Sequence, residues 1–299
     1  MLGILIINYN QWQKTVDCIN SVFKTVKSPY KIYLLDNASA NDSAQELERI
    51  YKNNKRVAFI KNKQNTGYAN GNNLLINLAE KDGCNKILIS NNDIIFDDNA
   101  IDKLYNDICE NDCLAIAPRL KYPNGAIQQN IKKEAPNFKK YILSETYFHN
   151  FDKKRKYQNT YVAKKFEYVY WISGAVFIAD TSKFKSIGYF DKNTFLYFEE
   201  YILAEKAAKN NLKIAIDPLA TAYHFHGAST GGNANLFTRT ENLKSELYFF
   251  KNYKNFSKSK LNLLRNIRCL EVLFTFTKEH QFKNALKFIK SSKKILRNT

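Results

Sequence analysis

Three polar side chains, Asn91, Asn92 and Asp93, follow the apolar run of residues 86–90. This run has the length and composition of a buried strand. In an open α/β sheet, ligands bind just beyond the carboxyl ends of the strands. A carboxylate flanked by two amides at that point suits a divalent cation that carries phosphate oxygens, because hard cations prefer oxygen ligands. A polar turn after a strand is the alternative interpretation.

Strand and helix patterns alternate through the first 118 residues and position this element. Apolar runs over residues 2–7, 30–35, 57–60 and 86–90 predict strands, and helical spacing follows over residues 11–25, 42–52, 68–80 and 98–110. Such alternation predicts an α/β protein with a mostly parallel sheet flanked by helices on both faces.

The pattern is less regular in the second half. Residues 121–165 are polar, basic and aromatic without a clear period, which predicts a long loop or a mobile lid over a cleft. Order returns over residues 166–179, followed by a predicted helix at 199–210 and predicted strands at 213–217 and 220–225. From about residue 234 the pattern is helical and basic. We therefore expect one domain over residues 1–232 and a helical basic C-terminal region over residues 233–299.

The net charge of +18 is unevenly distributed, because residues 235–299 hold 15 Lys and Arg against 4 Asp and Glu. A basic tail favours an anionic surface such as nucleic acid, a phosphorylated glycolipid or a membrane leaflet, and a solvated helix face is the alternative.

The five cysteines have no paired spacing and no signal peptide is apparent, so we expect a reducing cytoplasm. The sequence contains no run of 18 apolar residues, so no membrane-spanning helix is predicted.

Several short segments, in order, carry a family resemblance. They are residues 7–10 (INYN), 35–39 (LDNAS), 65–73 (NTGYANGNN), 90–93 (SNND), 171–175 (WISGA), 188–191 (GYFD), 195–200 (FLYFEE) and 224–227 (HFHG). Over roughly residues 3–230 the chain resembles glycosyltransferase family 2, and it is most similar to the rhamnosyltransferase-like branch. The resemblance implies a GT-A fold with a nucleotide-binding half at 1–118 and an acceptor or catalytic half at 119–232. It also implies a nucleoside-diphosphate-sugar donor, a divalent metal (Mn²⁺ or Mg²⁺) and inversion at the anomeric carbon.

Polar residues of the first half are then expected to bind the donor. Asp36 would accept the ring N–H of uracil or thymine from a UDP- or dTDP-linked sugar, unless it only caps the following helix. Asn65, Gly67 and Asn70 border a turn and a helix N-terminus, which suits phosphate or ribose but also fits an ordinary turn. The expected donor-binding set is Asn8, Asp36, Asn65, Gly67, Asn70, Asn91, Asn92 and Asp93.

The metal ligands implied by the resemblance are Asp93 and His224. Many family members have an acidic residue where Asn91 stands, so this element has only one carboxylate and its cation site should be weaker. Histidine suits Mn²⁺ or another transition ion. A histidine between aromatic residues is often structural, and His226 is the alternative ligand.

The family's general base corresponds to Glu200, which would take the proton of the acceptor hydroxyl. The helix dipole explains two carboxylates at a helix start equally well. The family's usual acidic residue two positions later is Ile202 here. The expected walls of the acceptor and sugar pocket are Trp171, Ser173, Gly174 and Glu199, although a tryptophan also packs in cores.

Together these expectations describe a cytoplasmic, metal-dependent, inverting transferase. Its acceptor would be a lipid-linked oligosaccharide or growing glycan in the assembly of a bacterial O-antigen, capsule or similar polysaccharide. The basic helices would touch the anionic inner membrane leaflet, or would form a homodimer.

Two other functions are alternatives to this one. A sugar nucleotidyltransferase would need a phosphate-binding loop rich in glycine and basic residues near residue 10. The segment 8–12 (NYNQW) contains neither glycine nor a basic residue. A non-catalytic module that binds nucleic acid would explain the basic tail but not Asp93, Glu200 and His224.

Overall fold

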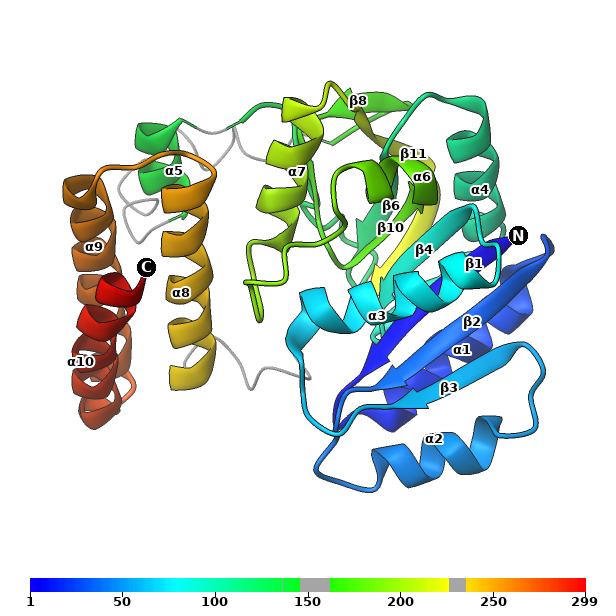
Figure 1. The fold of residues 1–299 in the computed structure, drawn as a ribbon, viewed down its shortest axis with the longest axis horizontal. Helices are drawn as coiled ribbons and strands as arrows, with labels where there is room; N and C mark the ends of the chain where they lie inside the picture. The colour runs from blue at the N-terminus through cyan, green and yellow to red at the C-terminus, as the bar shows by residue number, and fades with distance from the viewer. Residues whose placement is uncertain (136, 146–161, 226–234) are drawn as a thin grey trace.

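The computed structural model describes residues 1–135, 137–145, 162–225 and 235–299. Figure 1 shows a twisted sheet with helices on both faces, and a bundle of C-terminal helices beside it. The α/β sheet predicted from the alternating patterns is confirmed.

The first four strands of the chain are parallel to one another. The elements of this part of the chain are β1 (Leu2–Asn8), α1 (Trp12–Thr25), β2 (Tyr30–Asp36), α2 (Ser43–Tyr51), β3 (Val57–Lys61), α3 (Gly67–Lys81) and β4 (Lys86–Asn91). β1 lies between β2 and β4, with Asn8 opposite Asp36 and Ile7 opposite Asn91. The polar ends of these three strands therefore meet at one edge of the sheet.

The second half adds antiparallel strands. It contains β5 (Ile94–Phe96), α4 (Ala100–Glu110), β6 (Ala115–Lys121), β7 (Ile131–Lys132), α5 (Phe138–Glu145), β8 (Glu167–Val169), β9 (Trp171–Ile172), β10 (Val176–Asp180), α6 (Thr181–Ser186), α7 (Glu199–Lys209) and β11 (Ile214–His224). The main sheet has the order β3-β2-β1-β4-β10-β6-β11-β5, with β8 beside β11 and a separate β7-β9 pair. β10 runs antiparallel to both of its neighbours, β4 and β6.

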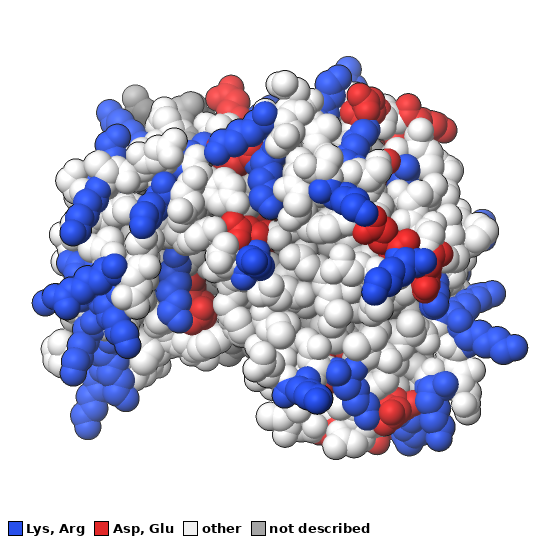
Figure 2. All heavy atoms as spheres, in the orientation of Figure 1, with Lys and Arg blue, Asp and Glu red and all other residues white. Residues whose placement is uncertain are grey.

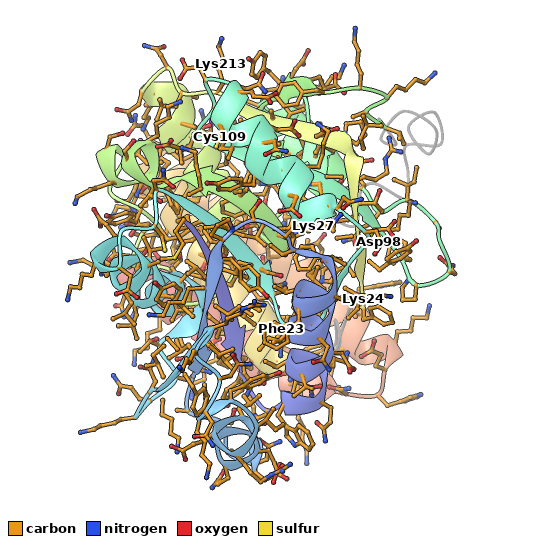
Figure 3. All side chains as sticks on the ribbon, turned by 90° about the vertical axis from the view of Figure 1, so that its right-hand side faces the viewer. Phe23, Lys24, Lys27, Asp98, Cys109 and Lys213 are labelled. Atoms are coloured by element: carbon orange, nitrogen blue, oxygen red, sulfur yellow. The ribbon has the colours of Figure 1, made fainter. Side chains whose placement is uncertain are left out.

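Alternating apolar side chains cover both faces of the sheet. On β1, Ile4 and Ile6 pack with α1, α2 and α4, whereas Leu5 packs with α3. Strands that are buried on both faces have nearly continuous apolar sequences, as β1 does. Figure 3 views the molecule from the α1 and α4 side, with Phe23 on α1 and Cys109 on α4.

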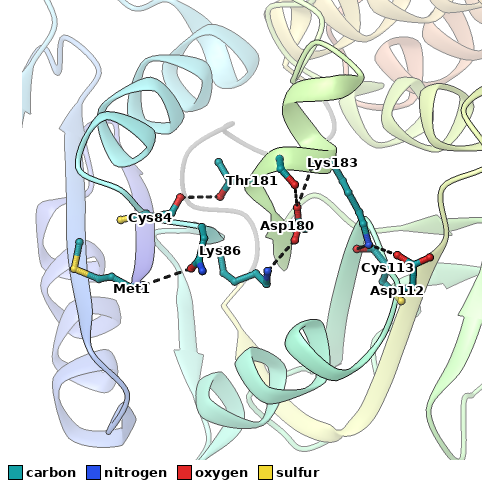
Figure 4. A network of polar contacts seen from close by, with 10 residues as sticks. Met1, Cys84, Lys86, Asp112, Cys113, Asp180, Thr181 and Lys183 are labelled. Carbon is teal, nitrogen blue, oxygen red and sulfur yellow. Dashed lines mark hydrogen bonds and ion pairs between the residues drawn. The ribbon is translucent and has the colours of Figure 1, made fainter.

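A polar network joins β4, β10 and the start of α6 (Figure 4). Lys86 Nζ lies 2.8 Å from Asp180 Oδ2, and Asp180 Oδ1 accepts the Lys183 N–H as the cap of α6. Burial alone would raise the pKa of Asp180, but the hydrogen bonds from Lys86, Ser182 and Lys183 lower it to about 2. Asp180 therefore stays charged and fixes β10 beside β4.

The chain ends in helices α8 (Leu236–Asn252), α9 (Lys258–Lys278) and α10 (Phe282–Asn298). Their apolar side chains form a core with Tyr141 of α5 and with Phe198, Tyr201 and Ile202 at the start of α7. Within this core, Arg268 pairs with Glu246, which is fully buried, at 2.7 Å. The C-terminal helices thus pack against the helix that carries the candidate base.

Several details differ from the sequence predictions. Residues 121–145 are not one loop, because they contain β7 and α5, and residues 146–161 of the predicted lid lie outside the described residues. The two strands predicted at 213–217 and 220–225 form one strand, β11, with an irregularity between Asp217 and Thr221. β5, β6 and α6 were not predicted. The division at residue 232 remains a prediction.

In the part of the chain that the structure describes, no helix combines the length and apolarity needed to cross a bilayer. The five cysteines are all free thiols.

Candidate active site

A cavity of about 650 Å³ is lined by residues at the carboxyl ends of the strands and at the starts of α3 and α7. Its volume is within the range of about 300–1,000 Å³ that is usual for small-molecule sites. Predicted site residues that line it are Asn65, Gly67, Asn91, Asn92, Asp93, Ser173, Gly174, Glu199, Glu200 and His224. The fold therefore brings together side chains from segments more than one hundred residues apart in sequence.

The other predicted site residues, Asn8, Asp36, Asn70 and Trp171, do not line this cavity. The amide of Asn70 donates to the carbonyls of Thr66 and Lys192. The Trp171 ring lies 5.6 Å from the ring of Tyr201 and packs against the aromatic core. This placement agrees with the alternative interpretation, in which Trp171 is a packing residue.

Asn8 and Asp36 take part in a buried hydrogen-bond network behind the cavity wall. Asn8 Nδ2 donates to Asp36 Oδ2 at 2.8 Å, and Asn8 Oδ1 accepts from Thr15 Oγ1 at 2.7 Å. Thr15 in turn accepts from Asn92 Nδ2, and Asp36 also accepts from the hydroxyl and the N–H of Ser39. The network ties the ends of β1, β2 and β4 to α1, so it fixes the edge of the sheet on which the cavity lies.

The turn before α3 is organised by Asn37, which sequence reasoning did not single out as a site residue. Its Nδ2 donates to Asn65 Oδ1, and its Oδ1 accepts the Thr66 N–H. Asn65 Oδ1 also accepts the Gly67 N–H at 2.9 Å. Gly67 has φ +78°, and a Cβ there would overlap the carbonyl of Phe195. Only glycine fits this contact between the turn and the segment that leads into α7.

Asp93 and His224 are brought together by strand pairing. β11 runs antiparallel to β5, with His224 opposite Ile94, the residue after Asp93. Asp93 Oδ1 lies 3.3 Å from His224 Nε2, and both side chains are buried. His226, the alternative ligand, lies outside the described residues.

This pair offers two atoms of the kinds that bind divalent cations. Asp93 Oδ1 faces His224 Nε2, and Gln128 Oε1 lies 3.2 Å from His224 Nδ1 on the other side of the ring. Carboxylate oxygens and imidazole nitrogens are both common ligands of divalent metals, so the pair fits a cation-binding role. Among the described residues no third His, Cys, Asp or Glu completes a metal cluster.

Glu199 and Glu200 begin α7 after a corner of unusual backbone. Tyr197 and Phe198 have φ of 71° and 68°, in the left-handed region that non-glycine residues rarely adopt. Residues held in this way are often found at functional sites. The corner turns the chain so that both carboxylates line the cavity.

Burial affects the protonation of both carboxyls. Burial, and then the charge of Glu200, raise the pKa of Glu199 well above its usual value of 4.5. The Oε1 atom of Glu199 is buried and has no hydrogen-bond partner among the described residues. Burial also raises the pKa of Glu200, while hydrogen bonds from backbone N–H groups, including that of Gly174, and the charge of Lys132 oppose the shift. Glu199 is thus the proton-bearing member of the pair, and Glu200 is the better candidate for a base.

Gly174 and Tyr68 set the distance across the cavity near Glu200. A Cβ on Gly174 would lie 3.2 Å from Glu200 Cγ, so the lack of a side chain lets the turn between β9 and β10 approach the carboxylate closely. The Tyr68 hydroxyl donates to the Gly174 carbonyl at 2.6 Å. Tyr68 was missed by sequence reasoning, and its position within the resembling segment 65–73 was the available signal.

The C-terminal region also contributes to the cavity, which the sequence did not indicate. Asn235 and Phe237, at the start of α8, line it, and the Phe237 ring meets the Phe195 ring edge-on with centroids 6.0 Å apart. No motif distinguishes these residues from the rest of a basic, aromatic helix.

Comparison with known proteins agrees with the fold. The structure of GalNAc-T7 with UDP, GalNAc and Mn²⁺ superposes with a TM-score of 0.63 at 15% identity, covering 85% of this chain and 49% of that one. Residues 1–349 of S. aureus TarS with UDP-GlcNAc give 0.55 at 17% identity, covering 97% and 81%. The mannosyltransferase PcManGT from Pyrobaculum calidifontis with GDP-Man and Mn²⁺ gives 0.54 at 9% identity, covering 97% and 74%. This chain thus spans about half the length of GalNAc-T7.

These identities show a shared GT-A fold and no more. No curated protein matches the sequence. The sequence model for glycosyl transferase family 2 matches residues 3–169, which include Asp93 and more than half of the chain. The chain belongs to glycosyl transferase family 2.

Proposed function

We propose that this glycosyltransferase moves a sugar, with inversion, from a nucleoside diphosphate to a hydroxyl of a glycan, with Glu200 as the base. The observation that carries the proposal is one cavity lined both by the Asp93–His224 pair and by the Glu200 carboxylate. A cation-binding pair and a base at one site are what metal-assisted glycosyl transfer needs. The family match ends before Glu200 and His224, so their roles rest on this geometry.

Asp93 and His224 would hold a divalent cation, Mn²⁺ or Mg²⁺. When bound, the ion neutralises the diphosphate of the donor and so makes it a better leaving group. The Asp93 Oδ1 and His224 Nε2 atoms, which face each other 3.3 Å apart, support the assignment, and an imidazole ligand suits Mn²⁺ or another transition ion. The structures of GalNAc-T7 and PcManGT also contain Mn²⁺.

We propose that the nucleotide lies along the carboxyl ends of β1, β2 and β4. Asn91 and the Asn65–Gly67 turn line the cavity there. Asp36 is buried behind this wall and accepts hydrogen bonds from Asn8 and Ser39. A contact between Asp36 and uracil or thymine, and with it a UDP- or dTDP-linked donor, stays a prediction from family resemblance. Rhamnose remains a prediction from branch resemblance.

In the transfer, the acceptor oxygen forms a bond to the anomeric carbon while the bond from that carbon to the diphosphate breaks. The nucleoside diphosphate leaves with the electron pair, and the hydroxyl proton passes to Glu200. Attack from the side opposite the leaving group inverts the anomeric centre. A raised pKa makes Glu200 a stronger base, provided that the working pH exceeds that pKa.

The surface of the C-terminal helices supports contact with an anionic membrane leaflet, where a lipid-linked acceptor would be found. Figure 2 shows lysine and arginine side chains crowded over α9 and α10 at the lower left. Exposed apolar side chains on the same helices are Leu263, Leu270, Phe274, Phe282 and Leu286. Each basic residue near an anionic surface contributes about 1 kcal/mol to binding. We propose peripheral membrane contact, with a homodimer as the alternative use of this surface.

Calorimetric titration with UDP and dTDP, each with and without Mn²⁺, tests the donor site. We expect Mn²⁺-dependent binding of one nucleotide, lost in Asp93→Ala and in His224→Ala. The control is Asp98→Ala, which removes an exposed carboxylate nearby and should bind as wild type does. Failure of wild type to bind either nucleotide, together with salt-sensitive binding to DNA, would overturn the proposal in favour of a polyanion-binding module.

A further inference from the structure

A second cavity, of about 290 Å³, lies next to the first and shares the candidate base with it. Glu200 and Tyr197 line both cavities, so the two meet at the corner where α7 begins. The volume is at the lower end of the range of about 300–1,000 Å³ for small-molecule sites, which suits one sugar residue better than a nucleotide. A ligand in the second cavity would therefore lie beside Glu200, next to a ligand in the first.

The walls of the second cavity combine aromatic and polar side chains. Tyr141, Tyr201 and Phe288 form a buried aromatic floor, and Thr238, Arg239 and Asn242 contribute a hydroxyl, a guanidinium and an amide from successive turns at the start of α8. Aromatic rings pack against the apolar C–H groups of a sugar, while planar amide and guanidinium groups match its hydroxyls. This composition suits a small polyhydroxylated ligand.

Charge balance in this cavity argues against an anionic ligand. Arg268 is held by two carboxylates, with Nη2 at 2.7 Å from Glu246 and Nη1 at 2.7 Å from Glu271. Burial lowers the pKa of Arg239, and the charge of Glu271 opposes this shift. With Glu200 also in the wall, the cavity has no surplus of positive charge that would bind a phosphate. A neutral sugar is therefore the better fit.

Hydrogen bonds hold the C-terminal helices against the segment that carries the base. Ser245 Oγ donates to the Leu196 carbonyl at 2.7 Å, and the hydroxyls of Tyr248 and Tyr253 donate to Asp191 Oδ2 at 2.8 and 2.6 Å. The wall formed by α8 thus has a defined position relative to Glu200, as a site for an acceptor requires.

We propose that the second cavity is the acceptor subsite, that it holds the neutral sugar residue bearing the reacting hydroxyl, and that Thr238, Arg239 and Asn242 determine which sugar is accepted. The inference rests on the proposed function, because Glu200 serves as a base only in that reaction. The acceptor hydroxyl reaches Glu200 from the second cavity, and the anomeric carbon of the donor approaches from the first.

Saturation-transfer NMR with methyl glycosides of glucose, galactose, mannose and rhamnose, in the presence of UDP or dTDP and Mn²⁺, tests the subsite. At least one glycoside should bind to wild type. Asn242→Ala, which removes one amide, should weaken this binding about three- to tenfold. Asn242→Trp should abolish it by filling the cavity. The matched control is Asn252→Ala, an exposed asparagine of the same helix.

Nucleotide titration of every variant separates the two proposals. Loss of nucleotide binding by wild type would overturn the proposed function. Normal nucleotide binding with no glycoside signal from wild type would overturn the acceptor subsite alone. The acceptor subsite would also be overturned if Asn242→Trp, while still binding nucleotide, bound the glycoside as tightly as Asn252→Ala does.

Discussion

Replacing Glu200 with glutamine tests the role of the base most directly. Glutamine has nearly the same shape and keeps an oxygen that can accept the Gly174 N–H. Gly174 leaves room beside Glu200 Cγ, so the substitution needs no repacking. The change therefore removes proton acceptance and little else.

The expected loss follows from the contribution of a positioned base, about 10²–10⁴-fold in rate. At about 1.4 kcal/mol for each factor of ten, this raises the activation free energy by about 3–5 kcal/mol. Nucleotide binding should not change. The wild-type rate should rise with pH through the pKa of Glu200, which burial places above 4.5, because only the ionised carboxylate accepts a proton. The rate of Glu200→Gln should lack this rise.

The assay measures release of nucleoside diphosphate from the sugar nucleotide whose base the titrations identify, with water or glycan as the acceptor. Glu199→Gln is the matched control, because it changes the neighbouring carboxyl and should keep the pH-dependent rise. A loss of less than about tenfold in Glu200→Gln, or a pH profile equal to that of wild type, would refute the assignment of the base.

Four further predictions concern stability and surface contacts. The pKa of Glu199 is raised in the folded state, so the contribution of its carboxyl to stability is fully present below about 4.5 and is lost as pH rises through the folded pKa. Because the pKa of Glu200 is raised as well, Glu199→Gln should show a smaller fall in thermal stability across pH than wild type. Glu246→Ala leaves Arg268 buried without its fully buried partner and should lower the free energy of unfolding in urea by about 3–5 kcal/mol. Gly67→Ala places a Cβ against the Phe195 carbonyl at φ +78°, where the left-handed backbone alone costs about 1–2 kcal/mol, so both the melting temperature and nucleotide affinity should fall. In sedimentation with anionic vesicles, the double variant Leu270→Ser, Phe274→Ser should bind less than wild type does. The control Leu219→Ser, which changes an exposed leucine of β11, should bind as wild type does. Equal binding by the double variant and the control would exclude this surface.

Local sequence patterns predicted the parallel half of the sheet because its strands are buried on both faces and alternate with amphipathic helices. They missed β6 because Pro118 and Arg119 interrupt its apolar run. In the structure Pro118 pairs next to the irregularity of β11 between Asp217 and Thr221, and prolines are tolerated at such positions. The direction of β10 was also hidden, because an apolar run does not encode its orientation.

Helix α5 was missed for a related reason. Its sequence has little helical period, and its aromatic side chains pack on the C-terminal helices. The Phe138 ring lies 6.0 Å from the Phe250 ring and 4.8 Å from the Phe256 ring. Tertiary contacts of this kind override local propensity.

At the site, motif order placed Asp93 and His224 as partners, and the pairing of β5 with β11 supplies the physical reason that they meet. The acceptor-side wall formed by Arg239 and Asn242 could not be found from sequence. These residues lie in a helix without a motif, and only the packing of α8 against α7 brings them near Glu200.

The left-handed corner at Tyr197 and Phe198 has a consequence for truncation of the chain. Each of these residues costs about 1–2 kcal/mol relative to ordinary helical backbone. The bond from Ser245 to the Leu196 carbonyl restrains the corner from outside. Without residues 235–299 the corner would relax, and the first turn of α7 would rotate the Glu200 carboxylate. A shortened chain would keep its parallel sheet yet lose both the orientation of its base and the part of the first cavity that Asn235 and Phe237 form.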